Sequence, residues 1–190
     1  MQHQPQHNYM RHQGRALTLL QLWAISRGDD LRGSEHYDMS AGKVFGAYAP
    51  QSIVGPDPFY KLQVLKDESK SNKEARPELI GATRHADPLL CAVNAVATMF
   101  LLRFGKGGLL PFPDMFNFSI DWPSQNHLMT NEEGTGPLSY DAHAMLFDQM
   151  KTAAGLEIAL HGVSTKLRSF GAMHASDYQA SHPEIERKGR

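Results

Sequence analysis

The sequence predicts an α+β fold that is mostly helical, with one small β-hairpin inserted between helices. Three observations predict it: apolar residues recur at helical spacing in several segments, one stretch alternates apolar and polar residues, and a polar run follows that stretch. A length of 190 residues fits one domain, and 41% hydrophobic with 21% charged residues is an ordinary globular composition. Wholesale disorder and a disulfide-rich miniprotein are therefore disfavoured.

Overall charge and cysteine content narrow the class of protein. Nineteen Lys and Arg residues against 20 Asp and Glu residues give a formal net charge of −1, so any basic surface must come from local segregation of charge. One cysteine excludes an internal disulfide and a Cys-based zinc site, and fits a reducing compartment. The longest apolar run, Pro88–Phe104, is too short to span a bilayer comfortably. We expect neither export nor a membrane segment.

The N-terminal residues 1–14 are rich in Gln and His, a composition that cannot bury enough apolar area to order itself. We therefore expect a flexible leader over residues 1–14 and a single domain over residues 15–190. The irregular spacing of the three leader histidines predicts no metal site: His3, His7 and His12. No cofactor is expected, because the chain carries no phosphate loop or dinucleotide fingerprint.

The first helices are predicted from periodicity and end signals. Ala16–Ile25 has apolar residues near helical period, and Gly28 follows where a helix commonly ends. A second short helix is predicted from Asp29 to about His36, because the carboxylates of Asp29 and Asp30 suit the positive end of a helix dipole.

The predicted hairpin follows. A first strand is indicated by the alternating apolar residues Tyr60, Leu62 and Val64. The polar run Lys66–Arg76 would form a turn that presents lysines to solvent, and a returning strand would carry Leu79, Ile80 and Ala82.

A third helix is predicted to begin at Asp87 as N-cap, with Pro88 at its first position, and to end at Gly105. Cys91 lies on the apolar part of this helix, where a thiol behaves as a small buried hydrophobe rather than as a nucleophile. The following segment, residues 105–136, is rich in Gly, Pro, Asn and Ser and is expected to be irregular.

Ser139 is predicted to cap a helix over Tyr140–Ala154 that Gly155 ends. The expected buried face of this helix comprises Ala142, Met145, Leu146, Met150 and Ala153. Two further helical segments are expected to begin at Ser164 and at His182.

Three widely separated basic motifs suggest a family. The first is an arginine at a predicted helix junction with acids three and eleven residues later: Arg27, Asp30 and Asp38. The second is a pair of lysines on the predicted hairpin turn: Lys70 and Lys73. The third is the run Thr165, Lys166, Leu167 and Arg168. Their order and spacing resemble the first arginine, hairpin lysine and His-x-x-Arg motifs of the tyrosine recombinase and integrase fold, with Thr165 where that family has histidine.

A more specific likeness lies in the block Gly81–Ala95, which contains Asp-Pro-Leu-Leu-Cys. This block resembles the second domain of the large DNA-binding subunit of the fungal centromere-binding complex, and the crypton mobile-element recombinases are similar. The resemblance runs from about Leu20 to Arg190.

The resemblance implies roles for particular residues. Arg27 and Arg168 would hold phosphate oxygens, which the forked guanidinium suits better than an ammonium. Lys70, or Lys73 in its place, would be the hairpin lysine that protonates a leaving oxygen. Lys166 and Thr165 belong to the same expected site. Arg84 and His85 are second-tier candidates for DNA contact, with a capping-region surface role as the alternative.

The family's nucleophilic tyrosine lies well beyond its second arginine, whereas Arg168 is followed by only 22 residues. We therefore expect that this chain lacks the nucleophile and that its C-terminus interrupts the family motif. The resulting expectation is a catalytically inactive, recombinase-like domain in the nucleus that binds double-stranded DNA through its backbone, without a metal. A homo-oligomer through missing or flanking regions is a possible further partner. Two alternatives stay open: a fragment of an active crypton-type recombinase, and a helical protein-interaction module without a nucleic-acid role.

Overall fold

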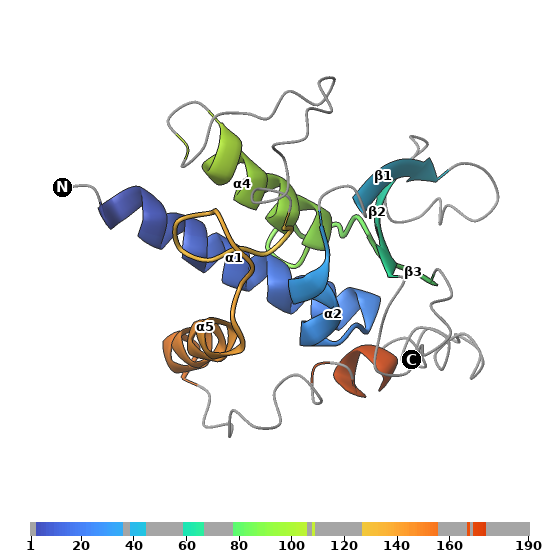
Figure 1. Ribbon diagram of the computed structural model, residues 1–190. Coiled ribbons are helices and arrows are strands. Elements are labelled where there is room, and N and C mark those ends of the chain that lie inside the picture. Colours follow the sequence, from blue (N-terminus) through green and yellow to red (C-terminus); the bar gives the residue numbers. More distant parts are fainter. Residues whose placement is uncertain are drawn as a thin grey trace.

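The computed structural model describes residues 3–35, 39–44, 59–66, 78–105, 108, 127–155, 167 and 169–173. Its named elements in chain order are α1 (His3–Ala24), α2 (Gly28–Gly33), β1 (Met39–Val44), β2 (Phe59–Lys66), β3 (Glu78–Thr83), α4 (Ala92–Phe104) and α5 (Tyr140–Ala153), drawn in Figure 1. The mixed, mainly helical class with one small sheet is confirmed.

The sheet has the order β1-β2-β3, and both strand pairs are antiparallel. The predicted hairpin is confirmed: Leu62 lies opposite Ala82 and Val64 opposite Ile80, and all four side chains are buried. This register keeps one face of the sheet toward the core. β1 was not predicted, because its sequence Met-Ser-Ala-Gly-Lys-Val lacks a β-branched run and pairing with β2 supplies the strand conformation.

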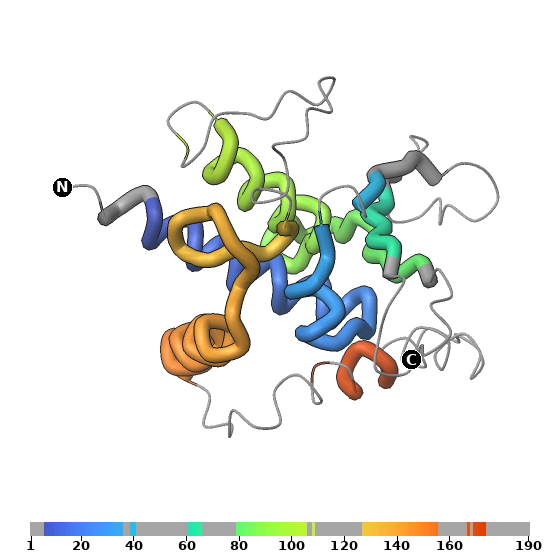
Figure 2. The backbone as a smooth tube through the Cα atoms, in the orientation of Figure 1, coloured from blue at the N-terminus to red at the C-terminus, as the bar shows by residue number. Residues whose placement is uncertain are grey.

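Helix α1 organises the core. Figure 2 shows it passing between α4 and α5, and it also contacts β3. Its buried apolar side chains fall at helical spacing: Ala16, Leu17, Leu20 and Ala24. The facing side chains of α4 follow the same spacing: Ala92, Ala95, Val96 and Met99. The helix predicted over Ala16–Ile25 is thus confirmed as the C-terminal half of α1.

The expected flexible leader is wrong for residues 3–14, which form the first part of α1. Tyr9 and Gln13 are fully buried. The Gln13 amide donates to the Thr130 carbonyl oxygen at 2.7 Å and accepts from the Thr130 N–H at 2.8 Å. The Tyr9 hydroxyl donates to Gln13 Oε1 at 2.8 Å and lies 2.5 Å from the Thr130 hydroxyl. Polar side chains stabilise this segment, which an argument from apolar composition misses.

The predicted start of the third helix is also wrong. Residues 88–90 form a turn, and α4 begins at Ala92 with Cys91 as its N-cap. The buried thiol accepts the N–H groups of Asn94 and His85, both at 3.4 Å. Cys91 is therefore structural, as predicted, and the predicted end at Gly105 is confirmed.

The 88–90 turn is fixed by α1. Arg15 donates to the carbonyl oxygens of Pro88 at 2.6 Å and Leu89 at 2.9 Å, and the Trp23 indole N–H donates to the Leu90 carbonyl oxygen at 2.8 Å. These bonds satisfy carbonyl groups that a continuous helix would have used, so the chain turns before α4 begins.

Helix α5 starts as predicted, with the Ser139 hydroxyl accepting the Ala142 N–H at 3.1 Å, and Gly155 follows its end with a φ of 64°. Its predicted buried face is partly wrong. Leu146 is buried, but Met145 is 52% exposed. Two side chains that were not predicted complete the buried face: His143 and Phe147. Leu146 packs close to Gly14 of α1, and His143 faces α2 through its contact with Arg32.

Two other predictions can be placed only in part. Leu167 and residues 169–173 are helical, in agreement with the helix expected from Ser164. Residues 109–126, with most of the predicted irregular segment, and the turn expected at His182 lie outside the described residues. None of the helices in the part of the chain that the structure describes combines the length and apolar character needed to cross a membrane.

Candidate nucleic-acid interface

Arg27 lies at the turn between α1 and α2, as the sequence predicts. The turn begins at Ile25, whose φ of 54° is left-handed, and Arg27 follows in extended conformation as the N-cap of α2. The Arg27 N–H donates to Asp30 Oδ2 at 3.2 Å. This contact satisfies one of the backbone donors that a helix start leaves unpaired. The acid three residues after Arg27 therefore fixes the backbone of the turn.

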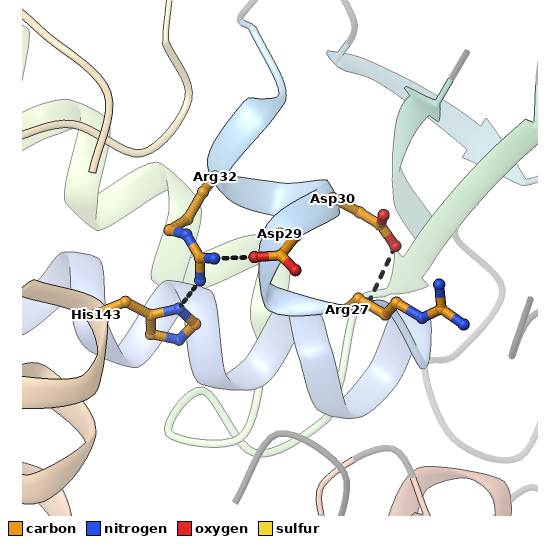
Figure 3. A network of polar contacts seen from close by, with 5 residues as sticks. All are labelled: Arg27, Asp29, Asp30, Arg32 and His143. Carbon is orange, nitrogen blue, oxygen red and sulfur yellow. Dashed lines mark hydrogen bonds and ion pairs between the residues drawn. The ribbon is translucent and has the colours of Figure 1, made fainter. Parts of the chain in front are cut away.

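The Arg27 side chain is half-buried, and its Nη1 is buried without a hydrogen-bond partner among the described residues. Figure 3 shows the guanidinium on the side of α2 where Asp30 lies, away from Arg32. A buried N–H group without an acceptor is unfavourable, and an anionic oxygen is the acceptor that a guanidinium binds most strongly. Arg27 therefore keeps one buried donor that the described residues do not satisfy.

Arg32 lies on the opposite side of α2 and is fully engaged, in contrast to Arg27 (Figure 3). It forms an ion pair with Asp29, its Nη1 lies 2.6 Å from His143 Nδ1, and its guanidinium lies 5.3 Å from the centre of the Tyr140 ring. These contacts join α2 to α5. Gly28 beneath them is required, since a Cβ there would approach His143 Cε1 to 2.6 Å.

The His143 ring is neutral in this network. Arginine only donates hydrogen bonds, so Nδ1 accepts from Arg32 and the ring proton is on Nε2. Burial, the largest cause, and the nearby Arg32 charge together lower the pKa of His143 from 6.5 to about 4, against a smaller opposing effect of Asp29.

Acidification is expected to destabilise the fold through His143. Because its pKa is 6.5 in the unfolded chain and about 4 in the folded one, the stability from the neutral ring is complete above pH 6.5 and is lost as the pH falls toward 4. We expect a loss of about 2–3 kcal/mol over this window, measured by urea unfolding at several pH values. His143→Asn keeps an acceptor near Nδ1 and is expected to remove this pH-dependent loss of stability. His7→Asn, at an exposed position, is expected to leave the loss unchanged. An unaltered pH profile in His143→Asn would refute the assignment.

The two second-tier candidates, His85 and Arg84, differ in how far they are engaged by other residues. The His85 ring stacks on Trp23 with ring centroids 5.5 Å apart, and its Nδ1 accepts the Asp87 N–H at 3.0 Å. These contacts make His85 part of the loop that precedes α4. Arg84 directly follows β3 and is exposed. A DNA contact by Arg84 stays a prediction.

The remaining predicted site residues lie outside the described residues: Lys70, Lys73, Thr165, Lys166 and Arg168. Their convergence on Arg27 stays a prediction. The structure does describe the segment just after Arg168. A Cβ on Gly171 would overlap the Leu22 carbonyl oxygen and lie 3.4 Å from Ile25 Cγ1, so this segment contacts the last turn of α1 and the residue two before Arg27. Sequence reasoning assigned no role to Gly171.

A cleft of about 450 Å³ between α1 and α5 is separate from Arg27; its lining includes His7, Arg11, Gly14 and Leu146. Within the described ranges, no cluster of three His, Cys, Asp or Glu side chains could hold a metal ion.

Comparisons of this chain with protein-family models, with curated proteins and with solved structures found no match.

Proposed function

We propose that this chain binds double-stranded DNA through the phosphate backbone, by means of a recombinase-like site centred on Arg27. The observation that carries the proposal is the buried Nη1 of Arg27, which has no hydrogen-bond partner in the described part of the chain, on a turn whose backbone is fixed by Asp30. The backbone contact with Asp30 fixes the turn that carries Arg27, and a phosphate oxygen would supply the acceptor that Nη1 lacks among the described residues.

The resemblance of the three basic motifs supplies the ligand class, since a phosphodiester is what the family's arginines hold. Phosphate contacts give affinity and register but carry no base sequence, so we propose binding with little sequence preference. We further propose that the chain binds without cleaving, because Thr165 stands where the family has its histidine. A nuclear location follows from this proposal.

Arg27→Ala is expected to weaken binding to two unrelated duplexes alike, by about tenfold at low salt, because it removes a charge-assisted contact to phosphate. Fluorescence anisotropy with labelled duplexes measures the affinity. Arg11→Ala is the matched control: it removes the same charge from an exposed position beside the α1–α5 cleft.

Two outcomes would contradict the proposal. A folded wild-type chain that does not bind duplex at low salt would favour the alternative of a helical interaction module. Equal losses in Arg27→Ala and Arg11→Ala would show that binding depends on general charge and not on the Arg27 turn.

A further inference from the structure

The end of α1 carries an unusual backbone. Ile25 is β-branched, yet its φ is 54° and its side chain is only 4% exposed. The left-handed region is unfavourable for such a residue, so surrounding contacts must hold it there. Ser26 follows, also buried, with a hydroxyl that has no partner among the described residues. Arg27 is the next residue, so its position depends on this turn.

Gly171 provides one of the contacts that hold the turn. It is buried in the short helical segment 169–173, which lies below α2 in the view of Figure 1. Its Cα approaches the Leu22 carbonyl oxygen so closely that an added Cβ would overlap that oxygen. The same Cβ would be 3.4 Å from Ile25 Cγ1. Only glycine permits this approach of two backbones.

We infer that Gly171 is a positioning residue for Arg27: its contact with Leu22 and Ile25 holds the strained turn that presents the Arg27 guanidinium to phosphate. The inference rests on the proposed function for its ligand. It adds that the uncharged residues 169–173 after Arg168 act through packing, because their contact with Leu22 and Ile25 sets the geometry of the first arginine motif.

The test compares Gly171→Ala with Gly33→Ala. Both replace a helical glycine, and alanine in a helix is normally favourable. A Cβ at Gly33 would meet nothing within 4 Å, whereas at Gly171 it would displace the segment from Leu22. We expect Gly171→Ala to weaken DNA binding several-fold and Gly33→Ala to leave it unchanged. Circular dichroism and thermal unfolding establish that both variants are folded.

A double variant separates positioning from a general loss of structure. If Gly171 acts through Arg27, Gly171→Ala costs affinity in the wild-type chain and adds no further loss in the Arg27→Ala chain. Equal losses in both backgrounds would overturn the positioning role.

Amide hydrogen exchange of residues 22–27 supplies a readout without DNA. Gly171→Ala is expected to speed exchange there, because the turn loses its cover, and unchanged exchange would overturn the inference. If the wild-type chain does not bind DNA, the proposed function fails and the positioning role fails with it. In that case, faster exchange would show only that Gly171 packs against the turn. The failure of the proposed function is therefore distinguishable from the failure of the packing contact.

Discussion

Replacing Gln13 with alanine is expected to lower the free energy of unfolding by about 3–4 kcal/mol. The Gln13 amide is fully buried and pairs with both backbone polar groups of Thr130, 117 residues away in the sequence. The variant leaves that N–H and that carbonyl without partners in the core, and each unpaired group costs about 1–3 kcal/mol. The Tyr9 hydroxyl also loses its acceptor on Gln13.

Urea unfolding followed by circular dichroism measures this loss, and Gln149→Ala on the exposed side of α5 is the control. Deletion of residues 1–14 should abolish cooperative unfolding, because it removes Tyr9, Met10 and Gln13 from the core. A truncated chain as stable as the full one would restore the flexible-leader interpretation.

Arg103→Met is expected to cost a similar amount, about 3–4 kcal/mol. Arg103 is fully buried and donates to the His127 carbonyl oxygen at 2.7 Å and to the Gly134 carbonyl oxygen at 3.0 Å. Burial lowers the pKa of Arg103, and the nearby Tyr9 opposes that effect. Burial also disfavours the charged form of Tyr9 and therefore raises its pKa. Methionine keeps much of the volume but leaves both carbonyl groups unpaired.

The exposed Arg84→Met is the control for Arg103→Met and should change the free energy of unfolding by less than about 0.5 kcal/mol. Because Arg103 and Tyr9 interact, Tyr9→Phe should cost less in the Arg103→Met chain than in the wild type. Equal costs in the two backgrounds would show that the residues act independently.

Parts of the fold with a local signal were predicted well. The alternation that formed β2 and β3 is a property of a few adjacent residues, and so are the Ser139 cap and the Gly155 stop of α5. The first half of α1 was missed because Thr130, far along the chain, satisfies its polar side chains. The start of α4 was missed because the Cys91 thiol caps the helix and Arg15 binds the Pro88 carbonyl oxygen. These contacts outweigh the helix-start signal of Asp87-Pro88.

The candidate site was predicted in the same uneven way. The placement of Arg27 at a helix junction follows from the end of one apolar period and the acids that open the next helix. The left-handed Ile25 and the close approach of Gly171 to Leu22 could not be predicted, because they depend on packing between distant segments. The convergence of Arg27 with Lys70 and Arg168 stays a prediction.

The most direct test of the account is the salt dependence of DNA affinity for the wild-type and Arg27→Ala chains. Each phosphate contact releases counterions, so the logarithm of the binding constant falls with the logarithm of salt concentration, by about 0.9 in slope per contact. We predict a negative slope for the wild-type chain and a slope shallower by about 0.9 for Arg27→Ala. Identical slopes, or no binding by the folded wild-type chain at low salt, would contradict the assignment of Arg27 to a phosphate.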